Sequence, residues 1–183
     1  MDKRSPALQS PVRPQIVVFL QPGEFFVGDA SHRIRTLLGS CVSVTLWAPR
    51  QHVGAMSHFL LARRGRALRG GECQDGRYGD EALELMLSQL LRRGVRAADC
   101  QAKIFGGGEM FPGQPARTIG IGRRNGEAAR ELLQQQGIEV VSESLFGAGH
   151  RQIVFDVGNG HVWARQIRID PDAPPPSSSS SSS

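Results

Sequence analysis

The sequence has no long apolar run and few cysteines. No segment approaches the roughly 20 consecutive apolar residues of a membrane-spanning helix, and the N-terminus lacks the apolar region of a secretory signal. The cysteines Cys41, Cys73 and Cys100 are odd in number and show neither a CxxC pair nor a metal-type spacing. We therefore expect a cytoplasmic protein with reduced thiols, no metal site and no membrane insertion.

Aromatic residues and concentrated positive charge are also scarce. The chain has eight Phe, two Trp and one Tyr, and 22 basic against 17 acidic residues give a net charge of +5. The basic residues form short clusters, such as Arg63–Arg66 and Arg92–Arg93, with acids close by. Nucleic-acid-binding proteins more often concentrate basic residues in one stripe interleaved with aromatics. The pattern predicts no nucleic-acid partner and favours solubility or an acidic partner surface.

The two ends of the chain differ in composition from the body between them. Residues 170–183 read DPDAPPPSSSSSSS, and residues 1–14 contain three prolines. Such segments bury too little apolar surface to offset the entropy lost on ordering. We expect a flexible segment over 1–14, one folded domain over 15–169 and a disordered Pro/Ser tail over 170–183.

Apolar periodicity within the body predicts a mixed α+β fold with layered sheets. The expected strands are Gln15–Leu20, Ser40–Trp47, His52–Ala62, Gln101–Phe105, Ile138–Ser142, Gln152–Val157 and His161–Ile167, the last two forming a hairpin around Gly158–Gly160. One helix is expected to begin at Asp80 as its N-cap and a second at Asn125, ending near Gly94 and Gly137.

The expected hairpin around Pro49 brings a thiol close to an imidazole. If a four-residue loop over 48–51 pairs Trp47 with His52, then Cys41 lies directly opposite His58 on one face, with Cβ atoms about 5 Å apart. A thiol nucleophile needs such a base. A slip of one residue would place the two on opposite faces.

Structural roles for the same residues stay open from the pattern alone. A strand cysteine is usually a small core residue, and a lone strand histidine is usually structural. Cys41 nevertheless lies on the face of Ser43 and Thr45 rather than with the valines. Cys73 and Cys100 have no matching histidine, so we take them as structural.

Two segments carry a family resemblance. Leu38–Val42 (LGSCV) and Gly54–His58 (GAMSH), with seventeen positions from cysteine to histidine, resemble the active-site region of CheD, the family of chemoreceptor glutamine deamidases. The resemblance continues in order through Tyr78, Lys103–Phe111 and Ile121–Asn125, and covers about Phe25 to Ile167. It implies a sandwich of mixed β-sheets with two main helices outside, shared with cysteine-dependent deamidases.

The resemblance also implies the catalytic roles. Cys41 would be the nucleophile and His58 the base that takes its proton. The family has a threonine shortly before the cysteine, but Arg35 stands six positions before Cys41. The nearest threonine is Thr36, which we carry over to this role, with Thr45 as an alternative. No cofactor is implied, because thiol, imidazole and water suffice.

Further residues are expected to contact the substrate. Backbone N–H groups near Gly39, Ser40 and Cys41 are candidates to bind the oxyanion. By resemblance, Gly107 in the Gly106–Gly108 turn borders the receptor-binding surface, with Met110 and Phe111 as apolar contacts. From their residue types alone, these two could equally belong to the core.

The implied partners are methyl-accepting chemotaxis receptors, whose glutamines would become glutamates, and a CheC-type phosphatase. Two other functions stay open. The protein could be a binding module of the chemotaxis array that engages receptors or the phosphatase with little or no catalysis. It could also be a thiol hydrolase for small amides, which a deep, closed pocket would favour.

Overall fold

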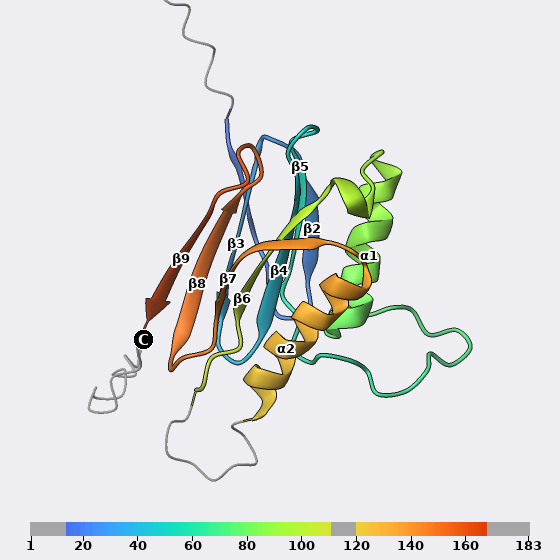
Figure 1. Cartoon of the computed structure of the whole chain (residues 1–183), viewed down its shortest axis with the longest axis vertical. Helices are drawn as coiled ribbons and strands as arrows, with labels where there is room; N and C mark the ends of the chain where they lie inside the picture. Colours follow the sequence, from blue (N-terminus) through green and yellow to red (C-terminus); the bar gives the residue numbers. More distant parts are fainter. Residues whose placement is uncertain (1–13, 111–119, 168–183) are drawn as a thin grey trace, which may run out of the picture.

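Two mixed β-sheets and two helices form three layers. The computed structural model describes residues 14–110 and 120–167 (Figure 1). The sheet that we call sheet A has the order β1-β3-β8-β9, with β1 at Ile16–Phe19, β3 at His32–Leu38, β8 at His150–Asp156 and β9 at Val162–Ile167. The second, sheet B, has the order β2-β5-β4-β6-β7, with β2 at Phe25–Gly28, β5 at Val53–Ser57, β4 at Val42–Ala48, β6 at Gln101–Gly106 and β7 at Glu139–Leu145.

Helices cover only one side of this sandwich. The helices α1 (Gly79–Arg92) and α2 (Gly120–Gln135) pack on sheet B, and sheet A lies on the opposite side (Figure 1). A short 3-10 turn, Ala97–Asp99, precedes β6. The expected α+β sandwich with two helices outside is confirmed.

Alternation along β4 separates two hydrophobic cores. Val42, Val44 and Leu46 face the helices and belong to the core between sheet B and α1 and α2. Cys41 and Trp47 face the other way and pack against the core between the sheets, which includes Leu20, Ile34, Leu38, Met56, Phe105, Ile153, Phe155 and Val157. The cysteine therefore lies on the side of β4 that faces sheet A.

All seven expected strands are present, with shifted bounds. The strands expected at Ser40–Trp47 and His52–Ala62 are found at Val42–Ala48 and Val53–Ser57. β2 and β3 were not predicted from the sequence. The alternation of Ile34, Thr36 and Leu38 with exposed Arg35 and Leu37 is a period-2 signal that predicts β3.

Both helix starts differ from the prediction. The N-cap of α1 is Tyr78, which makes no side-chain cap, and Asp80 lies in the first turn. α2 already includes Gly120, so Asn125 is a buried residue inside the helix and not its N-cap. Asn was favoured as a cap because its side chain competes for backbone groups, but here tertiary partners satisfy it.

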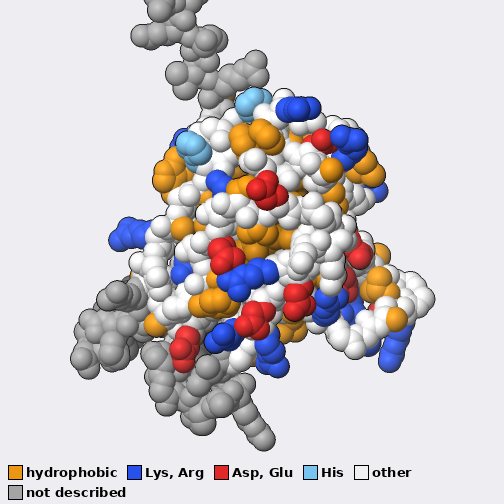
Figure 2. All heavy atoms as spheres, viewed as in Figure 1, with side chains coloured by type: hydrophobic (Ala, Val, Ile, Leu, Met, Phe, Trp, Pro, Cys, Tyr) orange, Lys and Arg blue, Asp and Glu red, His pale blue; other side chains and the backbone are white. Residues whose placement is uncertain are grey.

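Charged side chains are interspersed on the face shown in Figure 2. Among the ion pairs on the helices, Arg123 pairs with Glu127 and Arg130 with Glu143, at 2.9 and 2.5 Å. No helix within residues 14–110 and 120–167 is long and apolar enough to span a bilayer.

The segments predicted to be flexible, 1–14 and 170–183, lie outside the described residues except for Pro14, so the domain bounds stay predictions.

Candidate functional site

Cys41 directly precedes β4, in a segment whose carbonyls accept three hydrogen bonds. The carbonyl of Gly39 accepts from Gly108 N–H at 2.9 Å, and that of Cys41 accepts from Gly107 N–H at 2.8 Å. The Asn125 side chain donates to the carbonyl of Ser40 at 3.3 Å. With these three carbonyls engaged, the segment that presents the half-buried thiol is fixed in place.

His58 shares the face of Cys41, but not at the expected position. β4 and β5 pair Ala48 with Val53, and an isolated bridge pairs Val42 with Phe59. This register places His58 opposite Ser43, so the predicted direct pairing of Cys41 with His58 is wrong by two residues. The turn occupies residues 49–52 and not 48–51, because His52 adopts a φ of 51° and closes it with an N–H to the Ala48 carbonyl. A shift of two preserves the face, so Cys41 and His58 are diagonal neighbours.

A hydroxyl from sheet A orients the imidazole. Thr36 Oγ1 lies 2.8 Å from His58 Nδ1 and 2.7 Å from the Leu20 carbonyl oxygen. The hydroxyl donates its one hydrogen to Leu20, so Nδ1 must carry the ring hydrogen in this contact. Nε2 then has a lone pair, and it is buried without a hydrogen-bond partner among the described residues. An unpartnered acceptor therefore lies on the face of the thiol.

Burial keeps both reacting groups neutral at rest. It raises the pKa of the Cys41 thiol, although a hydrogen bond from the residue's own N–H lowers it. Burial also lowers the pKa of His58 to about 4, against the opposing effects of the Leu20 carbonyl and the Glu24 charge. At neutral pH the pair is thiol and imidazole, and proton transfer must accompany nucleophilic attack.

The glycine-rich turn after β6 packs directly against the cysteine segment. Gly106 and Gly107 have φ angles of 111° and 65°, which side-chain-bearing residues rarely adopt. A Cβ on Gly106 would lie 2.3 Å from the Cys41 carbonyl oxygen, and one on Gly107 would lie 2.6 Å from that of Gly122. The turn thus links the nucleophile to α2. Its tight geometry agrees with a structural role for the three glycines.

Met110 lies against the segment that leads to the cysteine. A Cβ on Gly39 would lie 2.9 Å from Met110 Sδ. Ser40 and Gly39 are described and lie next to the thiol, whereas Phe111 lies outside the described residues. Within the described part of the chain, the N–H groups of Ser40 and Cys41 donate to no backbone carbonyl. Both can therefore bind a developing oxyanion, with the N–H of Cys41 giving up its contact to the residue's own sulfur.

Two supporting residues were missed from the sequence. Asn125 is buried and also donates to the Leu60 carbonyl at 2.7 Å, so it ties the segments of Cys41 and His58 together. Arg151, buried on β8, donates to the carbonyls of Gly106, Ser144 and Phe146 at 2.7–3.0 Å and so braces the glycine-rich turn. A supporting role for Asn125 could have been inferred from the sequence, because it is a polar residue on the apolar side of α2. No sequence feature indicates the role of Arg151.

The other candidates do not join this site. The hydroxyl of Thr45 has a long 3.5 Å contact to the Lys103 carbonyl, so the alternative orienter does not contact His58. Cys73 is exposed, and burial raises the pKa of Cys100 to about 11. Among the described residues, no group of three or more His, Cys, Asp or Glu could hold a metal ion.

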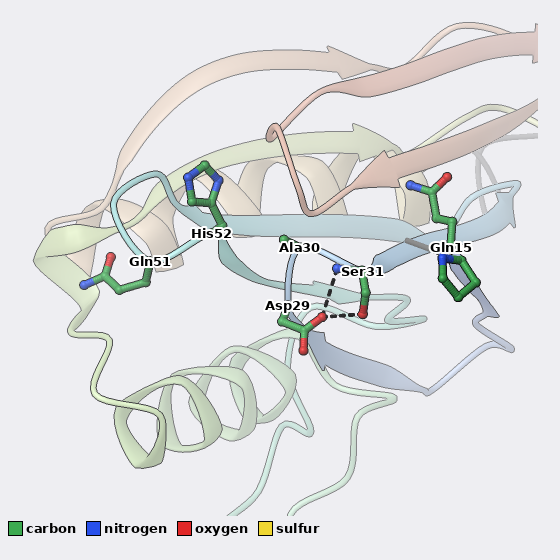
Figure 3. Close-up of a pocket in the computed structure, with 7 residues that line it drawn as sticks. Gln15, Asp29, Ala30, Ser31, Gln51 and His52 are labelled. Atoms are coloured by element: carbon green, nitrogen blue, oxygen red, sulfur yellow. Dashed lines mark hydrogen bonds between the residues drawn. The ribbon is translucent and has the colours of Figure 1, made fainter. Parts of the chain in front are cut away.

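A separate cavity opens between the start of β1 and two turns. It has a volume of about 550 Å³ and is lined by Pro14, Gln15, Asp29, Ala30, Ser31, Gln51 and His52 (Figure 3). In it, the Asp29 carboxylate accepts from Ser31 N–H and Oγ, and these bonds lower its pKa to about 2. The cavity includes neither Cys41 nor His58, and the Asp29 contacts are those of a local turn.

The fold and the site together define an α+β sandwich protein with a cysteine–histidine pair held between two sheets. Residues 60–166 match the family model described as CheD chemotactic sensory transduction. The chain therefore belongs to the CheD family. The matched range begins after Cys41 and His58, so the roles of these two residues rest on geometry and on the motif resemblance.

Relatives along nearly the whole chain agree with this assignment. A protein of Albidiferax ferrireducens named probable chemoreceptor glutamine deamidase CheD 2 is 61% identical over 153 residues, which cover 83% of this chain and 88% of the relative. The probable chemoreceptor glutamine deamidase CheD 3 of Dechloromonas aromatica is 45% identical over 80% of this chain and 85% of its own. The solved structure of YlmD from Geobacillus stearothermophilus is similar at a TM-score of only 0.44, with 12% identity over 74% of this chain and 61% of that chain.

Proposed function

We propose that this chain is a protein-glutamine glutaminase that deamidates glutamine side chains of methyl-accepting chemotaxis receptors. Relatives that align over most of both chains are named chemoreceptor glutamine deamidases. One observation carries the chemistry: Thr36 holds His58 Nδ1, which leaves Nε2 as an unpartnered acceptor on the face of Cys41. We assign Cys41, His58 and Thr36 as nucleophile, base and orienting residue.

The reaction follows from these roles. His58 Nε2 takes the thiol proton as Cys41 Sγ attacks the carboxamide carbon, and a tetrahedral oxyanion forms. The imidazolium returns the proton to the amide nitrogen, the C–N bond breaks, and ammonia leaves a thioester. Water then attacks the thioester while His58 accepts one of its protons. Release of the thiolate, which regains that proton, yields glutamate.

Neighbouring groups would stabilise the intermediate and bind the receptor. The N–H groups at Ser40 and Cys41 would donate to the oxyanion, with Gly39 giving the segment its close approach to Met110. Gly107, Met110 and Phe111 would border the bound receptor. Residues 15–169 would form the catalytic domain and act in the cytoplasm, where a CheC-type phosphatase is a candidate second partner.

Mass spectrometry of a chemoreceptor cytoplasmic fragment tests this function. Each converted glutamine adds about one mass unit, and peptide mapping locates it. The wild type and a Cys73→Ala variant, which loses an exposed thiol, should convert the same glutamines, whereas Cys41→Ala should convert none. Conversion by Cys41→Ala at the wild-type rate would reject the nucleophile. Binding of the fragment without conversion by any of the three proteins would favour the array-binding module.

A further inference from the structure

The outer face of sheet A is an exposed surface of apolar side chains and arginines. Sheet B is covered by α1 and α2, whereas no element of residues 14–110 and 120–167 covers sheet A from outside (Figure 1). Five large apolar side chains on this face are 40–55% exposed. The strand register places on this face Val17, Phe19, Arg33, Arg35, Leu37, His150, Gln152, Val154, Asp156, Trp163, Arg165 and Ile167.

Strand register places these side chains in rows. Phe19, Arg35, Val154 and Trp163 lie opposite one another across all four strands. Guanidinium groups stack on the aromatic rings, with Arg35 5.7 Å from the Phe19 ring centre and Arg33 5.6 Å from that of Trp163. Stacking of this kind reduces the conformational freedom of the arginines without neutralising their charge.

The side chains on the outer face of sheet A have the composition of a binding surface, with more positive than negative charges. Trp and Arg dominate the binding energy of protein interfaces, and exposed apolar patches mark such sites. Arg33 pairs with the buried Asp156 at 3.0 Å. Within the described residues, Arg35 and Arg165 pair with no acid. A complementary partner therefore presents carboxylates beside apolar side chains.

We infer that the outer face of sheet A binds an acidic, amphipathic helix of the chemoreceptor, at a distance from the glutamine being converted. The identity of the partner rests on the proposed function. The spacing suits a helix that runs along β3. Arg35 and Leu37 are roughly 7 Å apart along the strand, and positions i and i+4 of a helix are about 6 Å apart, so one carboxylate and one apolar side chain of a helix can contact both.

The face is continuous with the catalytic segment. Leu37 is on the outer face of β3, and Thr36 on the inner face contacts His58. The chain then passes through Leu38 and Gly39 to Cys41. A long receptor helix bundle could thus lie on sheet A and also reach the thiol. Such docking would raise the local concentration of the glutamine at the site.

A charge-reversal experiment tests this surface. Arg35→Glu/Arg165→Glu is compared with Arg92→Glu/Arg93→Glu, which makes the same charge change at the exposed end of α1. Binding of a labelled receptor cytoplasmic fragment is measured in a Cys41→Ala background, so that turnover does not intervene. We expect the sheet A double variant, Arg35→Glu/Arg165→Glu, to weaken binding at least about tenfold. The α1 double variant should change binding less than about twofold.

The possible outcomes distinguish a failure of the docking inference from a failure of the proposed deamidation. Equal affinity of the two double variants, or no binding of the fragment by the parent, overturns the inference. An oligomeric state that only the sheet A double variant changes, seen by sedimentation, would assign the face to a second copy and also overturns it. If the wild-type protein converts no glutamine and only the sheet A double variant loses binding, the docking surface is supported and the proposed deamidation is rejected. Thermal unfolding of each variant confirms that it is folded.

Discussion

Thr36 Oγ1 and His58 Nδ1 lie 2.8 Å apart and join the two sheets at the candidate site. The threonine comes from β3 in sheet A, and the histidine directly follows β5 in sheet B. Because the hydroxyl donates to the Leu20 carbonyl, the contact sets both the tautomer and the orientation of the ring. The chemistry proposed for Cys41 depends on this one contact.

Replacing Thr36 should therefore impair catalysis more than folding. Thr36→Val keeps the shape but leaves His58 Nδ1–H without its hydroxyl partner. We expect the rate of receptor deamidation to fall about 10- to 100-fold, and the free energy of unfolding to fall by about 1–3 kcal/mol. Thr36→Ser retains the hydroxyl and should recover most of the rate. Equal losses of rate in both variants would show that the hydroxyl is not the functional group.

The neutral resting pair predicts a simple pH dependence for thiol alkylation. Because burial raises the pKa of Cys41 and lowers that of His58 to about 4, the reactive thiolate is the minor species at pH 7. In a Cys73→Ala/Cys100→Ala background, the rate of iodoacetamide alkylation should rise about tenfold per pH unit from pH 6 to 8. A plateau across this range would instead indicate a preformed thiolate–imidazolium pair.

Asn125 should be needed to position the nucleophile segment. Asn125→Leu has a similar volume but leaves the carbonyls of Ser40 and Leu60 without their donor. The free energy of unfolding should fall by about 1–3 kcal/mol, and kcat should fall at temperatures where the variant is still fully folded. The exposed Glu131→Gln on the same helix serves as control. A kcat equal to that of the control would limit Asn125 to a structural role.

Gly107 should tolerate no side chain. Its φ is 65°, and a Cβ at this position would lie 2.6 Å from the Gly122 carbonyl oxygen, so Gly107→Ala must displace the turn or α2. We expect a lower melting temperature and slower deamidation, because the N–H of this residue holds the Cys41 carbonyl. Gly137→Ala is the matched control, since it also has a positive φ of 67° but no atom near its Cβ. A similar melting temperature for both variants would contradict the steric argument.

The sequence predicted well the features that depend on local pattern. Alternation along Ser40–Trp47 placed Cys41 on the face opposite the valines, and this face is the one that meets sheet A. The register was wrong by two residues because the turn depends on a left-handed His52, which the residue type does not indicate. Cys41 and His58 still share one face, since a register shift of two residues leaves each side chain on the same side of the sheet.

Features that depend on contacts distant in sequence were not predictable. The one-residue offset of Thr36 from the family position could not be judged without β3, which brings this hydroxyl to an imidazole 22 positions away. Asn125 has partners 65 and 85 positions away, and no local rule identifies these. The support from Arg151 arises the same way, from a fold that packs β8 behind the glycine-rich turn.

The tautomer of His58 tests the central claim most directly. Long-range proton–nitrogen NMR of protein labelled with nitrogen-15 histidine distinguishes a protonated ring nitrogen from a bare one. At pH 7 we expect a neutral ring with the hydrogen on Nδ1 and a bare Nε2, and a loss of this preference in Thr36→Val. A hydrogen on Nε2, or a charged ring at pH 7, would rule out His58 as the base, because it could then not accept the proton of Cys41.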